Sequence, residues 1–219
     1  LQWVTALRAV TFANAYSDNP GTSRTIGFAV QNATSSVPQQ TMTIAVIPIN
    51  DAPVAAAATV NAIDEDVADV NNPGTSVFDM VAAITDADTG ARKGIVITAV
   101  DATDGRWQYS LNGGTTWTTI LNASTSTAIP LAANLSHLVR FIPNPTFSGT
   151  SSFSFKAWDQ TSGTAGQAVD VTTSGGTTAF SANTATATIT VNNAVAGIYL
   201  SMNQNTKALQ FNGSSAYLS

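Results

Sequence analysis

The chain has 219 residues, of which 8 are Lys or Arg and 13 are Asp or Glu, so that it is only 10% charged with a net charge of −5. This acidic balance excludes nucleic acid as a partner, because binding to phosphates requires a basic surface. The chain has no Cys and a single His, His137, which excludes thiol catalysis, disulfides and a histidine metal centre. Together these exclusions predict a protein that is not an enzyme.

Short segments of alternating apolar and polar residues recur along the chain, without a sustained helical stripe. Such alternation is typical of strands with one buried face. The segments are 26–30, 41–47, 95–100, 153–158 and 185–191. Turn sequences such as Asn19-Pro20-Gly21, Asn72-Pro73-Gly74 and Asn112-Gly113 separate them. This succession predicts an all-β fold of Greek-key, immunoglobulin-like β-sandwiches.

An internal repeat divides the chain into three parts. Residues 26–32 align with 153–159 in their aromatic and aliphatic positions, and residues 49–54 align with 191–195. The second copy is longer, because it contains a stretch rich in Thr, Ser and Gly from about 161 to 183. We therefore expect residues 1–52 to be the closing strands of one sandwich, 53–194 to form a complete sandwich, and 195–219 to open a further β module.

Hydropathy predicts no membrane span. The longest apolar run, 52–60, contains Pro53 and is far shorter than the about 20 residues that a membrane-spanning helix needs. The first residues show neither a basic leader nor the apolar core of a signal peptide, so we expect the chain to be a segment of a longer protein. Few charges, abundant Thr and Asn and no thiols favour an extracellular location, either secreted or at the cell surface.

Acidic residues are concentrated in one stretch of the sequence. Nine of the thirteen lie between Asp64 and Asp104, opposed only by Arg92 and Lys93. Within this stretch, Asp86-Ala87-Asp88 directs two carboxylates to one side of an extended segment, which gives two hard oxygen ligands for Ca²⁺. The alternative is a solvated turn in which the Asp side chains cap the backbone.

Four motifs in the chain resemble those of the cadherin-like repeats of large bacterial surface and secreted proteins. Asn50-Asp51-Ala52-Pro53 is similar to the linker between repeats, and Asp86-Ala87-Asp88 matches the Asp-x-Asp motif. Glu65-Asp66 resembles the acidic motif early in a repeat, and Ala157-Trp158-Asp159 resembles the late Ala-x-Asp motif. The resemblance covers about residues 1–194.

The resemblance implies Ca²⁺ bound at the junctions between consecutive repeats. It implies that the ligands of the upper junction are Asn50, Asp51, Asp86, Asp88 and Asp159. Glu65 and Asp66 would face the next junction, where Asn192-Asn193 lacks the linker Asp. The cation would offset the repulsion between carboxylates and stiffen the joint, with an affinity of about 10⁻⁴–10⁻³ M, as is usual for extracellular modules.

Three further features carry weaker signals. The segment 110–117 resembles an Asp-box hairpin with Asn112 in place of Asp, and its single copy predicts a structural turn on which Trp117 packs. Arg106 beside Trp107 offers a cation–π pair or a sugar-stacking spot, with packing as the default. The tail 197–218 resembles the opening strands of a laminin-G or concanavalin-like jelly roll.

The leading hypothesis is a non-catalytic, calcium-stiffened cadherin-like spacer or adhesion module of a giant bacterial surface or secreted protein, with neighbouring repeats as its partners. One alternative is a subunit of a self-assembling extracellular filament, in which identical subunits complete each other's sandwiches by strand addition. A weaker alternative is a carbohydrate-binding module with cell-surface or matrix glycans as partners.

Overall fold

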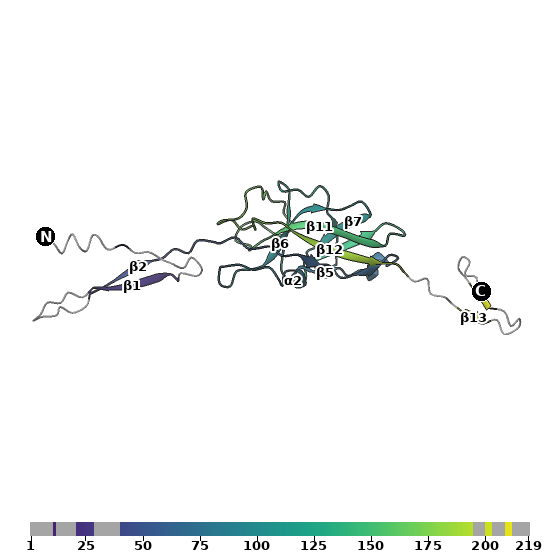
Figure 1. Cartoon of the computed structure of the whole chain (residues 1–219), viewed down its shortest axis with the longest axis horizontal. Helices are drawn as coiled ribbons and strands as arrows, with labels where there is room; N and C mark the ends of the chain where they lie inside the picture. Colours follow the sequence, from purple (N-terminus) through teal and green to yellow (C-terminus); the bar gives the residue numbers. More distant parts are fainter. Residues whose placement is uncertain (1–10, 12–20, 29–39, 195–199, 203–208, 212–219) are drawn as a thin grey trace, which may run out of the picture.

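The computed structural model describes residues 11, 21–28, 40–194, 200–202 and 209–211, and the described chain is nearly all-β (Figure 1). The predicted all-β class is therefore confirmed. Helical structure in this part is confined to a 3₁₀ turn η1, Asp69–Asn71, and a single turn of α-helix α2, Val77–Met80, which is capped by Ser76. No helix in the described residues is long and apolar enough to cross a membrane.

Two sheets make up the body of the molecule. In the four-stranded sheet the order is β5 (Thr75–Ser76), β10 (Leu138–Pro143), β7 (Gly105–Ser110) and β8 (Thr118–Thr119). In the six-stranded sheet the order is β3 (Ala58–Thr59), β12 (Ala185–Asn192), β11 (Gly149–Ala157), β6 (Gly94–Val100) and β9 (Ile129–Ala132), and β4 (Ile63–Asp64) also pairs with β12. All pairings are antiparallel except those of β3 and β4 with β12, which are parallel.

The core lies between these two sheets and is built around aromatic side chains. Trp107 of β7 and Phe141 of β10 are fully buried, and their ring centroids lie 5.1 Å apart. Phe153 comes from β11 in the other sheet and meets Trp107 edge-on at 4.9 Å. These contacts join the sheets face to face, because alternate residues of each strand point into the same core.

A second, smaller core covers the outer face of the six-stranded sheet. Val96 of β6 and Trp158, which follows β11, pack there against Val171 and Phe180. The last two residues belong to the stretch from 161 to 183, which the sequence identifies only as an insertion rich in Thr, Ser and Gly. This stretch therefore buries part of a sheet face that would otherwise be exposed to water.

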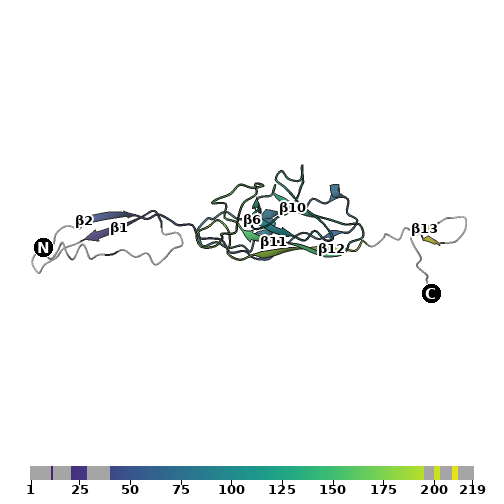
Figure 2. The same ribbon diagram turned by 90° about the horizontal axis from the view of Figure 1, so that it is seen from above.

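Strands β1 (Ser23–Phe28) and β2 (Gln40–Ala45) form a separate antiparallel pair ahead of the sandwich (Figures 1 and 2). The repeat alignment predicts that this pair corresponds to β11 and β12, which are also paired and antiparallel. The registers differ, however: the alignment places Ile26 opposite Ala45, whereas Ile26 lies opposite Met42. Beyond the sandwich, β13 (Leu200–Met202) and β14 (Leu209–Phe211) form a further small antiparallel pair.

Candidate metal site

The segment that connects β2 to the sandwich leads directly into a group of acidic side chains. Ile47 and Ile49 on this segment are 84% and 66% exposed, so the segment itself has little packing. It becomes fixed at its end, where the backbone N–H of Ala52 donates to the carbonyl of Gly176 at 2.8 Å. Val54 and Thr85 then exchange two backbone hydrogen bonds, which brings residues 50–54 beside the Asp86-Ala87-Asp88 loop.

The five residues predicted for the upper junction come together at this point. The backbone N–H of Asp51 donates to Oδ2 of Asp88 at 2.8 Å, and the backbone N–H of Asp88 donates to Oδ1 of Asp86 at 2.8 Å. The side-chain amide of Asn50 donates to Oδ2 of Asp159 at 2.8 Å. Three segments that are distant in sequence thus contribute to one cluster, which we call the junction cluster: Asn50, Asp51, Asp86, Asp88 and Asp159.

Two carboxylate oxygens in the junction cluster are buried without a partner. Neither Oδ2 of Asp51 nor Oδ2 of Asp86 has a hydrogen-bond partner in the described structure. The pKa of Asp86 is raised above its ordinary value, first by burial and then by the negative charges of Asp88, Asp159 and Asp51, against a lowering by the backbone hydrogen bond from Asp88. Buried oxygens that repel each other and lack donors are the oxygens that a cation would stabilise.

Asp159 is the most buried member of the junction cluster, with 2% of its surface exposed. Its Oδ1 accepts from the backbone N–H of Thr161 at 2.7 Å and from the hydroxyl of the same residue at 2.6 Å. The carbonyl of Thr178 accepts from the Asn50 amide at 3.2 Å. Sequence motifs miss Thr161 and Thr178, because they lie in the insertion, and only the turn signal Ser174-Gly175-Gly176 indicates that this stretch folds back.

The oxygen atoms of the junction cluster suit a hard cation, because carboxylate and carbonyl oxygens are the ligands that Ca²⁺ prefers. Asn50 presents its amide nitrogen to Asp159, so in this arrangement it acts as a hydrogen-bond donor. Within the described ranges, no three His, Cys, Asp or Glu side chains form a ready-made metal cage. Coordination by the junction cluster would therefore require its carboxylates to turn toward a common centre.

The two residues predicted to face the next junction lie away from the junction cluster. The backbone N–H of Glu65 donates to the carbonyl of Asn192 at 2.9 Å, and its Oε1 accepts from the backbone N–H of Ala194 at 3.3 Å. Asp66 is exposed. Glu65 thus lies beside the chain that leaves β12, while Asn32, the counterpart of Asp159 in the partial repeat, lies outside the described residues.

The weaker sequence signals also have defined places. The Asp-box-like segment forms a tight turn in which Oδ1 of Asn112 accepts from the backbone N–H of Thr116 at 2.9 Å, as expected for a structural turn. Arg106 forms an exposed ion pair with Asp69 at 3.1 Å, and Trp107 beside it is fully buried and cannot meet a sugar. His137 accepts the backbone N–H of Ala132 on Nδ1 at 3.0 Å, and burial lowers its pKa.

Comparisons with protein-family models, with curated proteins and with solved structures give no match for this chain.

Proposed function

We propose that this chain is a non-catalytic, cadherin-like spacer or adhesion module, of Greek-key topology and extracellular, in which Ca²⁺ at the junction cluster fixes one repeat to the next. The observation that carries the proposal is the pair of buried, unpartnered oxygens on Asp51 and Asp86. They lie where the exposed connection from β2 enters the sandwich, which is where a cation would control the angle between neighbouring units.

Asp51, Asp86, Asp88 and Asp159 would hold the cation, and the carbonyls of the 175–178 turn lie beside them. The cation would supply positive charge that offsets the mutual repulsion of the four carboxylates. The residues of the chain supply the rest: Thr161 fixes Asp159, and the Asp51 backbone fixes Asp88. Glu65 and Asp66 would belong to the junction with the following unit.

Thermal melting with and without Ca²⁺ tests the proposal. For a dissociation constant of about 1 mM, 10 mM Ca²⁺ stabilises the folded state by about 1.4 kcal/mol. In a domain of this size that corresponds to a rise of about 3–6 °C in Tm. Asp88→Asn should abolish the rise, because it removes the charge but keeps the shape of the side chain.

Asp104→Asn is the matched control, since Asp104 belongs to the same acidic stretch of the sequence but not to the junction cluster. It should keep the full calcium response. If the Tm of the parent chain does not change on adding Ca²⁺ or a chelator, the proposal is contradicted. An equal loss of response in Asp104→Asn would mean that Ca²⁺ acts through the overall negative charge.

A second candidate function, assembly into a filament by strand exchange, is favoured by the β1–β2 pair. Ile26, Phe28, Met42 and Ile44 share one face of this two-stranded sheet, and Met42 is 53% exposed. In the described residues these strands pair only with each other. A second copy of the chain could cover that face. Sedimentation velocity of the whole chain tests this, and Met42→Asp should reduce any association that is observed. A chain that stays monomeric at millimolar concentration would contradict assembly into a filament.

A further inference from the structure

A cleft of about 680 Å³ opens on the sandwich at a place that shares no residue with the junction cluster. Its walls come from the chain between the end of β3 and α2, from the turn between β7 and β8, and from the start of β10. Its volume lies within the range of about 300–1,000 Å³ that is typical of small-molecule sites. Its polar lining includes Asp69, Asp79, Trp117 and Arg140, and Val70 lies at its rim.

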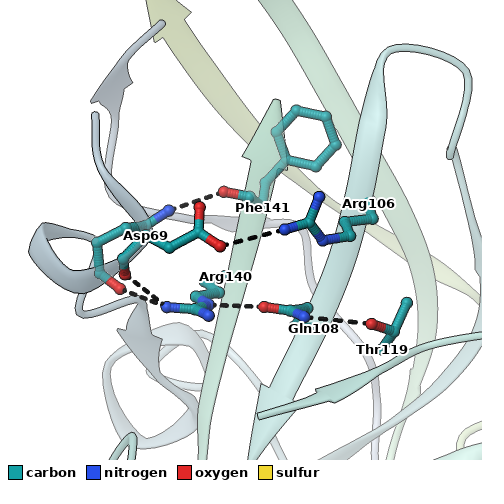
Figure 3. A network of polar contacts seen from close by, with 7 residues as sticks. Asp69, Arg106, Gln108, Thr119, Arg140 and Phe141 are labelled. Atoms are coloured by element: carbon teal, nitrogen blue, oxygen red, sulfur yellow. Dashed lines mark hydrogen bonds and ion pairs between the residues drawn. The ribbon is translucent and has the colours of Figure 1, made fainter. Parts of the chain in front are cut away.

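Arg140 is the central polar group of this cleft. Although it is charged, only 7% of its surface is exposed. Its Nε donates to Oε1 of Gln108 at 2.9 Å, and its Nη1 donates to the carbonyls of Asp69 at 2.8 Å and Asn72 at 3.2 Å (Figure 3). Among the described residues no group accepts from its Nη2, so this buried guanidinium keeps one nitrogen, with two N–H groups, for a ligand.

Trp117 lies against this guanidinium, whose central carbon is 4.0 Å from the centroid of the indole. The tryptophan is held from two sides. The Asp-box-like turn fixes the chain before it, with the Ser110 hydroxyl accepting from the backbone N–H of Gly114 at 2.9 Å. Gly74, at φ +75°, leaves room for the ring, because an added methyl group there would lie 2.9 Å from the indole. No described residue accepts from the indole N–H, so Trp117 brings a second donor to the cleft.

Carboxylates line the same cleft. Asp69 uses Oδ2 for its ion pair with Arg106 at 3.1 Å, and Asp79 uses Oδ2 to accept from the hydroxyl of Ser76 at 2.6 Å. Within the described part of the chain, the Oδ1 atoms of both residues have no hydrogen-bond partner. The cleft therefore offers both donors and acceptors, and Val70 with Pro73 and Leu138 adds apolar surface.

This combination selects the chemistry of the ligand. An anion would meet Asp69 and Asp79, and a cation would meet Arg140 and the indole N–H. Hydroxyl groups both donate and accept, so they can satisfy every one of these groups without a charge. A pyranose ring carries such hydroxyls on its rim and C–H groups on its faces, which the apolar residues can cover. We propose that this cleft binds a neutral saccharide of one or two rings.

The test uses the whole chain on an array of neutral and sialylated glycans, followed by calorimetric titration with the neutral oligosaccharide that binds best. Trp117→Ala should weaken binding at least about tenfold, because it removes the indole N–H and the ring against which Arg140 lies. Because Trp117→Ala also removes a packed ring, a second variant is Val70→Asp, at a rim residue that is 89% exposed. It places a charge where the apolar face of the sugar would lie and should weaken binding equally.

The matched control is Leu121→Asp, which changes an apolar residue that is 74% exposed but does not line the cleft. It should bind as the parent chain does, and binding should persist in a chelator, so that the outcome is independent of the calcium proposal. No binding to any glycan, binding to acidic glycans only, or equal affinity in Val70→Asp and the parent chain would each overturn the proposal.

Discussion

Asp86 carries an electrostatic cost in the folded protein, and this cost has a defined pH dependence. Its pKa is raised from 3.8 by burial and by neighbouring carboxylates, so the folded state favours the protonated form. The contribution of Asp86 to stability is therefore most favourable below the pKa that it has in the unfolded chain. This contribution is lost as the pH rises through the pKa that Asp86 has in the folded chain. Asp86→Asn removes the charge, so in a chelator at pH 7 it should melt slightly higher than the parent chain, with the difference vanishing near pH 3.

Calcium should reverse this order, because the parent chain gains stability from the cation and the variant does not. Asp170→Asn is a suitable control, since Asp170 is an exposed carboxylate whose pKa is lowered by hydrogen bonds from Thr172. Asp170→Asn should lower the Tm at pH 7, because the folded state favours the charged form of Asp170. A lower Tm for Asp86→Asn in a chelator would show that its hydrogen bond to Asp88 outweighs the repulsion.

Lys156 shows what the sequence does not predict about a single residue. In the strand pattern of 153–158, Phe153 and Phe155 face the core and Lys156 is expected on the solvent side. Its side chain is nevertheless buried and donates to the carbonyls of Ser181 at 3.1 Å and Ala182 at 2.8 Å. The insertion covers this face of β11, and period-two alternation carries no information about what packs on the second face.

Among the elements, β6 and β12 are predictable from the sequence, whereas β7 and β10 are not among the alternating segments that it predicts. β6 and β12 begin within a residue of their predicted starts. The sequence of β6 is almost continuously apolar, and that of β12 alternates between apolar and polar residues, in each case over more than five residues. β3, β4, β5 and β8 have two residues each, too few for any period to be visible. Their pairing is decided by the strand beside them, so they become apparent only in the folded sheet.

Strand β12 allows the alternation to be tested directly. Ile189 is 1% exposed in the main core, whereas the next residue, Thr190, faces the solvent. Ile189→Ala should cost about 2–5 kcal/mol in the free energy of unfolding, since it deletes three buried carbons and leaves a cavity. Thr190→Ala should cost less than about 1 kcal/mol. Urea denaturation measures both, and equal costs would mean that β12 is not buried on the face assigned to Ile189.

At the scale of the whole molecule, the junction cluster depends on the order of the sheets. Residues 50–51, 86–88 and 159 lie far apart in the sequence and meet only because Thr85 pairs with Val54 and the insertion folds back over β11. Composition alone indicates that acidic residues are concentrated at 64–104, but most of these lie elsewhere. Motif resemblance selected the five residues that the fold brings together, whereas Thr161 and the 175–178 turn required the structure.

The same geometry predicts how Ca²⁺ should change the chain as a whole. The connection from β2 is held to the sandwich by the N–H groups of Asp51, bonded to Asp88, and Ala52, bonded to Gly176. If a cation joins Asp51 to the other carboxylates, this connection can open only after the cation is released. Hydrogen exchange at these two amides should therefore slow about tenfold at 10 mM Ca²⁺, for a dissociation constant of about 1 mM. Amides in the middle of β11 should be unaffected under conditions of local opening, and Asp88→Asn should remove the slowing at Asp51 and Ala52 alike. No slowing at Asp51 and Ala52 in a chain whose Tm rises with Ca²⁺ would instead indicate that the cation binds the sandwich without fixing its connection to β2.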